Sequence, residues 1–381
     1  MVKMLKVLAI VAILMNVLAV NIFADEPLEC LDEYKDMLDA LPEEIAGLLP
    51  ESLFSDSVED ISQGAKDVSS FGYILKVIAE YLGLELQSAL KLLATLLGIL
   101  IICAVMNSVK SSFSSNGIAS VLSVCVRSSL FLTACMSQLV IVKAVESFFE
   151  RLCIFANSLL ALSGALYAMG GNVSAAVVNH SSLIIFINIV ENLCSKSAVP
   201  IVSICIAFCA VSCIAPEVNI GGISGFFKRT YTTALTFIMT VFVTVMGAQN
   251  LIASKTDTLA GKAAKFAVGN LIPTVGSALA GTLGTVSTGV EYIRATVGTV
   301  GVVAIILMVV PIILTLLLTK LVFGILEGVA DILDCAGEKK MITEMSSING
   351  FLLACACISS VCLIFIMTLF VKCSAAIGGT I

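Results

Sequence analysis

The chain alternates long apolar runs with short polar segments. Uncharged stretches long enough to span a membrane recur along it, and roughly 20 apolar residues suffice to cross the hydrocarbon core of a bilayer. The pattern predicts eight transmembrane helices, at residues 88–109, 118–142, 152–170, 173–195, 198–215, 231–253, 299–319 and 351–372. We therefore expect an all-α, polytopic helical membrane protein.

The composition points the same way. Hydrophobic residues make up 59% of the 381 residues and charged residues only 13%, whereas soluble domains carry about 25% charged residues. A soluble domain of this length cannot bury so much apolar surface, so the class of soluble globular proteins is excluded.

The first residues follow the layout of a secretory signal peptide. Lys3 and Lys6 precede an apolar run over residues 7–20, and the small Ala24 offers a cleavage point before Asp25. A basic start, a short apolar core and a small residue at the cleavage site are typical of such peptides. We interpret residues 1–24 as a signal peptide, with an uncleaved first span as the alternative.

An acidic segment follows, and it would then be extracytoplasmic. Residues 25–70 contain 14 acidic residues against two lysines. Apolar residues at helical spacing and two Leu-Pro-Glu sequences, at 41–43 and 49–51, predict short amphipathic helices, because proline followed by glutamate favours a helix start. The segment is either a solvated cap on the bundle or a docking surface for a protein partner.

A glycine-rich stretch interrupts the otherwise regular topology. An outside N-terminus places Lys110, the pair 228–229 and the pair 339–340 in the cytoplasm, in agreement with the positive-inside rule, but it leaves the lysines at 255–265 outside. Residues 266–290 therefore cross the membrane, re-enter it or lie on it. Because Pro273 and several glycines break this stretch, we favour a broken or re-entrant helix covered by protein or water.

These patterns divide the chain into five parts. They are a signal peptide (1–24), an acidic extracytoplasmic segment of amphipathic helices (25–87), transmembrane helices 1–6 (88–254), a Gly/Thr-rich amphipathic or re-entrant segment (255–298), and C-terminal transmembrane helices with a cytoplasmic amphipathic helix (299–381).

The Gly/Thr-rich segment holds the candidate passage-lining residues. Small residues at four-residue spacing allow helices to approach closely, and hydroxyl groups suit a surface wetter than lipid. The tract either lines a passage or packs tightly within one subunit. Its residues are Ser277, Gly281, Thr282, Gly284, Thr285, Ser287 and Thr288.

The candidate intramembrane polar residues within predicted spans are Arg127, His180 and Glu191. Such groups must pair, reach the interface or face water. We expect Arg127 to pair with Glu146, Glu150 or Glu191, and each of the three residues to serve as a structural contact or as part of a translocation path.

Another charged pair, Glu291 and Arg294, stands at helical spacing before the next span. We interpret it as part of a solvated face.

Cysteine and histidine give no support for a metal site or an enzyme. The 14 cysteines lie mostly in apolar spans, where buried cysteine packs as a small hydrophobic residue. The single histidine excludes a His-Glu-x-x-His zinc site, and neither a P-loop nor a Gly-x-Ser-x-Gly motif is present. We assign no catalytic residue, cofactor or metal, and expect no nucleic-acid binding, since a basic patch is lacking.

A family resemblance rests on the sequence Lys-Phe-Ala-Val-Gly-Asn-Leu-Ile-Pro-Thr-Val-Gly at 265–276, followed by Ala-Thr-Val-Gly-Thr-Val-Gly at 295–301 and two terminal spans. From about residue 216 to the end, the chain resembles the stage III sporulation protein AE family. The motif residues are Lys265, Phe266, Gly269, Asn270, Ile272, Pro273, Val275 and Gly276.

The resemblance implies a component of the secretion-like channel complex between the mother cell and the forespore in endospore formation. It implies a multi-pass protein of the mother-cell membrane, with its N-terminal segment in the intermembrane space. The expected partners are the lipid bilayer, further copies of the chain and other proteins of that complex. The alternatives are a secondary transporter, which binds substrate between broken helices at the midplane, and a non-conducting scaffold that recruits channel partners.

Overall fold

Helices account for all the regular structure that the computed structural model describes, which covers residues 31–55, 57–109, 116–214, 221–271 and 276–372. The predicted signal peptide, 1–24, lies outside these residues. Six helical segments are long and apolar enough to cross a membrane: Gly72–Val109, Val124–Met169, Val173–Val211, Gly221–Ala263, Tyr292–Ile332 and Ala336–Lys372. The prediction of an all-α, polytopic helical membrane protein is confirmed.

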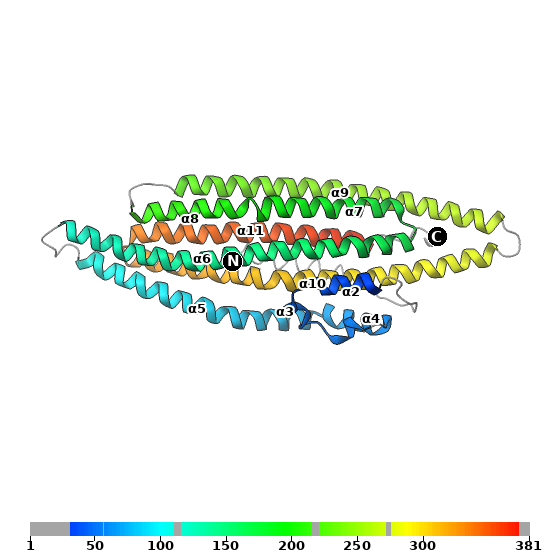
Figure 1. The fold of residues 1–381 in the computed structure, drawn as a ribbon, viewed down its shortest axis with the longest axis horizontal. Coiled ribbons are helices and arrows are strands. Elements are labelled where there is room, and N and C mark those ends of the chain that lie inside the picture. Colours follow the sequence, from blue (N-terminus) through cyan, green and yellow to red (C-terminus); the bar gives the residue numbers. More distant parts are fainter. Residues whose placement is uncertain (1–30, 56, 110–115, 215–220, 272–275, 373–381) are drawn as a thin grey trace.

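The long helices form an elongated bundle (Figure 1). They are α5 (Phe71–Val109), α6 (Asn116–Met169), α7 (Val173–Ile189), α8 (Ala198–Ile214), α9 (Gly221–Leu271), α10 (Gly276–Ile332) and α11 (Ala336–Lys372). Helices α6, α9 and α11 run in one direction, and α5, α7, α8 and α10 run in the other. The N-terminal elements α2 (Leu31–Asp39), α3 (Glu43–Ala46), η1 (Glu51–Phe54) and α4 (Val58–Ser69) are short.

The prediction of eight separate spans is corrected at two places. Segments 118–142 and 152–170 belong to the single 54-residue helix α6. Charged residues from Lys143 to Arg151 interrupt the hydropathy there, but this stretch contains neither glycine nor proline, the residues that most disfavour a helix. Segments 173–195 and 198–215 join into one span, because the π-helix η3 (Val190–Ser195) connects α7 to α8.

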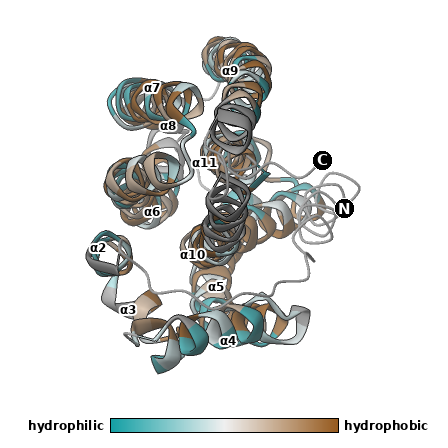
Figure 2. Ribbon diagram, turned by 90° about the vertical axis from the view of Figure 1, so that its right-hand side faces the viewer, coloured by the Kyte–Doolittle hydropathy of each residue, from teal (hydrophilic) through white to brown (hydrophobic). Residues whose placement is uncertain are grey.

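The helices lie in two layers when viewed along the bundle (Figure 2). One layer contains α9, α11, α10 and α5 in that order, and the other contains α7, α8 and α6. The pair α10–α11 is the core of the bundle, since α11 contacts α6, α7, α8 and α9 as well as α10. Helices α5 and α9 stand at the outer edges of their layer.

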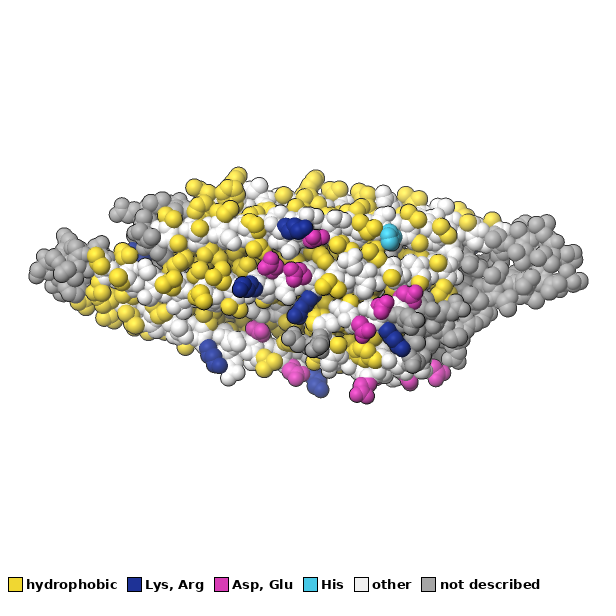
Figure 3. Space-filling view, in the orientation of Figure 1, with side chains coloured by type: hydrophobic (Ala, Val, Ile, Leu, Met, Phe, Trp, Pro, Cys, Tyr) yellow, Lys and Arg dark blue, Asp and Glu magenta, His cyan; other side chains and the backbone are white. Residues whose placement is uncertain are grey.

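The bundle is much longer than a bilayer is thick. At 1.5 Å per residue, the 54 residues of α6 span about 80 Å, against about 30 Å for a hydrocarbon core. Figure 3 shows acidic and basic side chains gathered near the middle of one face, with apolar side chains extending toward one end. In α6 the charged stretch 143–151 separates two apolar stretches.

The short N-terminal helices pack on the long ones. Helix α2 contacts α6, and α3 and α4 contact α10, with Tyr34, Leu38 and Ile61 fully buried among the apolar residues between them. Helix α3 begins at Glu43 and η1 at Glu51, directly after Pro42 and Pro50, while the amphipathic character of these short helices stays a prediction. The Tyr292 hydroxyl of α10 donates to Ser62 Oγ of α4 at 2.5 Å.

Candidate functional site

The segment 255–298 is the end of one long helix and the beginning of the next. Helix α9 continues to Leu271 and α10 begins at Gly276, and the predicted break at Pro273 lies outside the described residues. Figure 1 shows these two helix ends extending beyond the ends of the neighbouring helices. We call residues 255–271 and 276–298 the α9–α10 arms.

The sequence motif lies where the two arms meet. Lys265, Phe266, Gly269 and Asn270 are in the last turns of α9, and Gly276 is the first residue of α10. Three motif residues, Ile272, Pro273 and Val275, lie outside the described residues.

The small-residue tract, from Ser277 to Thr288, forms the first turns of α10. Its side chains lie outside the described part of the structure, as do those of the motif residues in α9, so its assignment to a passage or to packing stays a prediction.

Asp257 ties the α9 arm to the start of α7. Its carboxylate is buried and accepts hydrogen bonds from the backbone N–H groups of Ser174 at 3.0 Å and Ala175 at 2.8 Å. These are N–H groups of the first helical turn, which have no partner within the helix, and the helix dipole favours negative charge there. The carboxylate therefore caps α7 from a different helix.

Arg294 holds the α10 arm against the same turn. Its side chain is 0% exposed, its guanidinium lies 4.7 Å from the ring centroid of Tyr167, and Nη2 donates to the Leu166 carbonyl at 3.1 Å and to Asn172 Oδ1 at 3.3 Å. A second ring, that of Phe370, lies 5.8 Å away. Cation–π contact of this kind is strongest when the cation is desolvated.

The prediction of a solvated face at Arg294 was therefore wrong. The spacing of Glu291 and Arg294 indicates that the two residues share one helix face, but it does not indicate which residues cover that face. Val290, Ile293 and Val297 are buried beside Arg294, so this face of α10 points into the bundle.

The turn between α6 and α7 is shaped for these contacts. Gly171 has a positive φ of 67°, a conformation that glycine adopts without steric cost. A Cβ atom at Gly170 would lie 2.7 Å from Asn172 Oδ1 and 2.8 Å from Arg294 Nη2. Any side chain at position 170 would displace the Arg294 guanidinium or the Asn172 amide.

Arg127 pairs inside the bundle, as predicted, but with a different partner. Its Nε lies 3.0 Å from Glu338 Oε1 of α11, and the two side chains are only 13% and 3% exposed. The prediction that Glu146, Glu150 or Glu191 is the partner was wrong. Those residues are near in sequence, whereas the packing of α6 on α11 brings together residues that are 211 positions apart.

A second buried ion pair links α9 to α11, and sequence reasoning missed it. Lys228 Nζ donates to Glu344 Oε2 at 2.8 Å, and the Ser224 hydroxyl donates to the same oxygen at 2.9 Å. Lys228 is buried while its neighbour Arg229 is exposed. In the sequence Lys228 and Arg229 serve only as topology markers. The position of Glu344 directly before the uncharged run 345–371 was the available signal.

The remaining predicted intramembrane polar residues lie on the surface. His180 is an exposed residue of α7 and is visible as the cyan group in Figure 3. Glu191 is exposed at the start of η3 and pairs with Lys196 at 2.6 Å, a surface contact of the kind that contributes about 0–1 kcal/mol.

Thiol groups lie mainly in the packed interior. Cys205 and Cys209 are buried in α8, and Cys194 Sγ lies 3.2 Å from Ser359 Oγ. Across the described ranges, no group of three or more His, Cys, Asp or Glu side chains could hold a metal ion.

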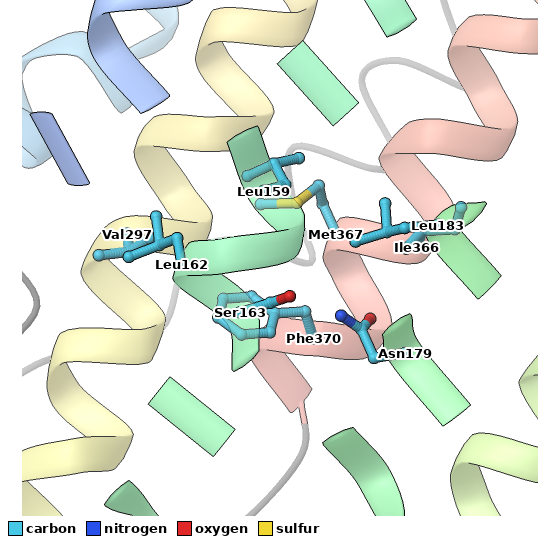
Figure 4. A pocket seen from close by; sticks show the side chains of 9 residues that line it. All are labelled: Leu159, Leu162, Ser163, Asn179, Leu183, Val297, Ile366, Met367 and Phe370. Atoms are coloured by element: carbon cyan, nitrogen blue, oxygen red, sulfur yellow. The ribbon is translucent and has the colours of Figure 1, made fainter. Parts of the chain in front are cut away.

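A small cavity lies between α6, α7, α10 and α11 (Figure 4). Its volume is about 10 Å³, and its lining is apolar apart from Ser163 and Asn179. A cavity needs roughly 10–15 Å³ to hold one water molecule. This cavity is therefore a packing defect or a single-water site, and it is too small to conduct a solute.

Comparison with known proteins supplies what the geometry cannot. The family model for stage III sporulation protein AE matches residues 53–376. Stage III sporulation protein AE of Bacillus subtilis (strain 168) is 26% identical over 255 residues, which cover 67% of this chain and 63% of that relative. The match thus spans less than two thirds of the relative's length, and no solved structure matches the chain. Because the family model covers most of its length, the chain belongs to the stage III sporulation protein AE family.

Proposed function

We propose that this chain is a membrane subunit of the passage between mother cell and forespore in endospore formation, and that several copies assemble around that passage. Family membership and six candidate membrane spans support the proposal. The acidic N-terminal segment then faces the intermembrane space, where it contacts other proteins of the complex.

The observation that carries the proposal is the packed interior of the bundle. Helices α10 and α11 fill its centre, and 67% and 56% of the residues in their apolar windows are buried. The cavity beside them holds at most one water molecule. A passage through one copy has no room along this core, so we place it between copies.

The outer helices are the surfaces available for assembly. Only 22% of the residues in the apolar windows of α5 and α9 are buried, and both stand at the edges of their layer (Figure 2). Helices that expose apolar residues along their length pack equally well against lipid or against a neighbouring copy. We assign the passage to the α9–α10 arms, with Thr282, Thr285 and Thr288 facing water.

Assembly and water access test this proposal together. Gly281→Leu and Gly284→Leu place branched side chains where close helix approach is proposed, so we expect both to abolish the oligomer on native gels. Thr285→Val keeps the shape and should preserve the oligomer. Thr285→Cys should react with a water-soluble thiol reagent beyond the level of the parent protein, while Leu316→Cys, at a fully buried position of α10, should not.

The alternatives make different predictions. A monomer in lipid vesicles with an unreactive Thr285→Cys variant would overturn the proposal and leave the non-conducting scaffold. Saturable, ion-coupled uptake by vesicles containing the purified protein would identify a secondary transporter instead.

A further inference from the structure

The interface between α6 and α11 carries a second polar level besides the Arg127–Glu338 pair. The two helices contact each other and run in the same direction. Gln138 follows Arg127 by eleven residues in α6, and Asn349 follows Glu338 by eleven residues in α11. Eleven residues make about three turns and a rise of about 16 Å. Gln138 and Asn349 therefore lie level with each other, three turns beyond the ion pair, on the same faces of α6 and α11.

Both amide side chains are buried and form no hydrogen bonds with the described protein. Gln138 and Asn349 are each 0% exposed. Among the described residues, neither the amide nitrogen nor the amide oxygen of either side chain has a hydrogen-bond partner. Burying such a group without a partner costs about 1–3 kcal/mol, so four unpaired atoms at one level would be a heavy cost to the fold.

We propose that Gln138 and Asn349 bind water between α6 and α11. Each side chain offers an acceptor oxygen and two donor hydrogens, and a buried water molecule typically makes about three hydrogen bonds to such groups. The equal spacing of the two residues from the ion pair places both amides at one level of the α6–α11 contact, where a water molecule can bridge them.

A charged group lies near this level. Lys320 is exposed, and its Nζ would be 3.0 Å from a Cβ atom at Gly350, the residue after Asn349. A buried polar level of this kind fixes the register of one helix on another, as a buried asparagine does in coiled coils.

The first test detects the water directly in the native protein. In ¹⁵N-labelled protein in lipid vesicles, water-edited solid-state NMR should show early magnetisation transfer to the side-chain amides of Gln138 and Asn349, assigned by their loss in Gln138→Met and Asn349→Leu. The backbone amides of the buried Leu352 and Cys355 serve as dry references. Side-chain amides as slow as these references would overturn the proposal.

The second test asks whether the two residues act as a unit. Gln138→Met and Asn349→Leu each leave one amide buried without its bridge, and each should lower the melting midpoint by about 1 to 4 °C. The double variant removes both amides, so its loss should be smaller than the sum of the two. Additive losses would contradict the proposal.

Ser360→Ala provides the matched control. Ser360 lies another eleven residues along α11, but its hydroxyl donates to its own helix at the Ala356 carbonyl, at 2.7 Å. The effects of Ser360→Ala and Gln138→Met on the melting midpoint should therefore add. If these two variants were coupled as strongly as Gln138→Met and Asn349→Leu, the coupling would report general packing, and the proposal would be contradicted.

Discussion

Asp257 of α9 caps the N-terminus of α7, with its Oδ2 accepting a hydrogen bond from the Ala175 backbone N–H at 2.8 Å. Across the same turn, Arg294 of α10 holds Asn172 and the Leu166 carbonyl. An acidic residue from one arm and a basic residue from the other thus form hydrogen bonds on both sides of the α6–α7 turn. This arrangement ties the positions of the α9–α10 arms, which carry the family motif, to the packed bundle.

Removing the Asp257 cap should destabilise the protein measurably. We expect Asp257→Ala to lower the free energy of unfolding by about 1–2 kcal/mol, the usual cost of losing an N-cap, and Asp257→Asn to lose less because it keeps one acceptor. Thermal unfolding in detergent measures the effect. Lys262→Ala, an exposed position on the same helix, is the control; if Asp257→Ala behaves like it, the cap contributes nothing.

The Arg127–Glu338 pair predicts an order of severity. Arg127→Leu leaves Glu338 buried without a partner, which costs about 3–5 kcal/mol for a buried pair, and Arg127→Glu places two carboxylates together and should be worse. The double variant Arg127→Glu/Glu338→Arg should recover part of the loss. The measurement is again thermal unfolding, with the exposed Lys143→Glu as the charge control. Equal and negligible effects of Leu and Glu at position 127 would show that the arginine only reaches toward solvent.

The sequence predicts the fold class well, because repeated apolar runs of bilayer length are typical of membrane-spanning helices. It predicts helix ends less well. The expected boundary between 142 and 152 rests on charge, but Lys143, Glu146 and Glu150 change the hydropathy of α6 without stopping the helix. Even a proline does not always end a helix, since Pro311 lies inside α10.

Partners in the interior could not be predicted from one sequence. Arg127 was expected to pair with an acidic residue. That this residue is Glu338 depends on how α6 packs on α11, which brings together positions 211 residues apart. The burial of Arg294 depends likewise on Tyr167 and Phe370, which come from two other helices. Local spacing identifies which residues share a face of a helix, and tertiary packing decides what that face contacts.

The contact of α2 with α6 should weaken at alkaline pH through Tyr34. Burial raises the pKa of the Tyr34 phenol above its ordinary value, so the unfolded segment ionises first. The stabilisation that the buried, neutral Tyr34 phenol gives the folded state is complete below a pH of about 10. It is lost as pH rises further, at about 1.4 kcal/mol per pH unit.

Melting midpoints between about pH 9 and 11 test this, with Tyr34→Phe as the control, since other groups also titrate in this range. The parent protein should lose stability more steeply than Tyr34→Phe. Parallel curves for the two proteins would mean that the phenol ionises equally easily in both states.

The contact of Gly298 in α10 with Val371 in α11 gives a packing prediction. A Cβ atom at Gly298 would overlap Val371 Cγ2, whereas at Gly324 of the same helix it would meet nothing within 4 Å. Alanine favours a helix over glycine by about 1 kcal/mol, so Gly324→Ala should be neutral or slightly stabilising. Gly298→Ala should instead lose about 1–3 kcal/mol through overpacking, despite the same gain in helix propensity.

Shortening the opposing side chain separates this steric cause from any other. In Gly298→Ala/Val371→Ala the clash is removed, so the double variant should be more stable than Gly298→Ala alone, even though Val371→Ala by itself removes apolar contacts. Thermal unfolding of the four proteins forms a complete cycle. If Gly298→Ala were as stable as Gly324→Ala, the two helices would have to lie further apart than the glycine contact requires, and the register of the α10–α11 pair would be wrong.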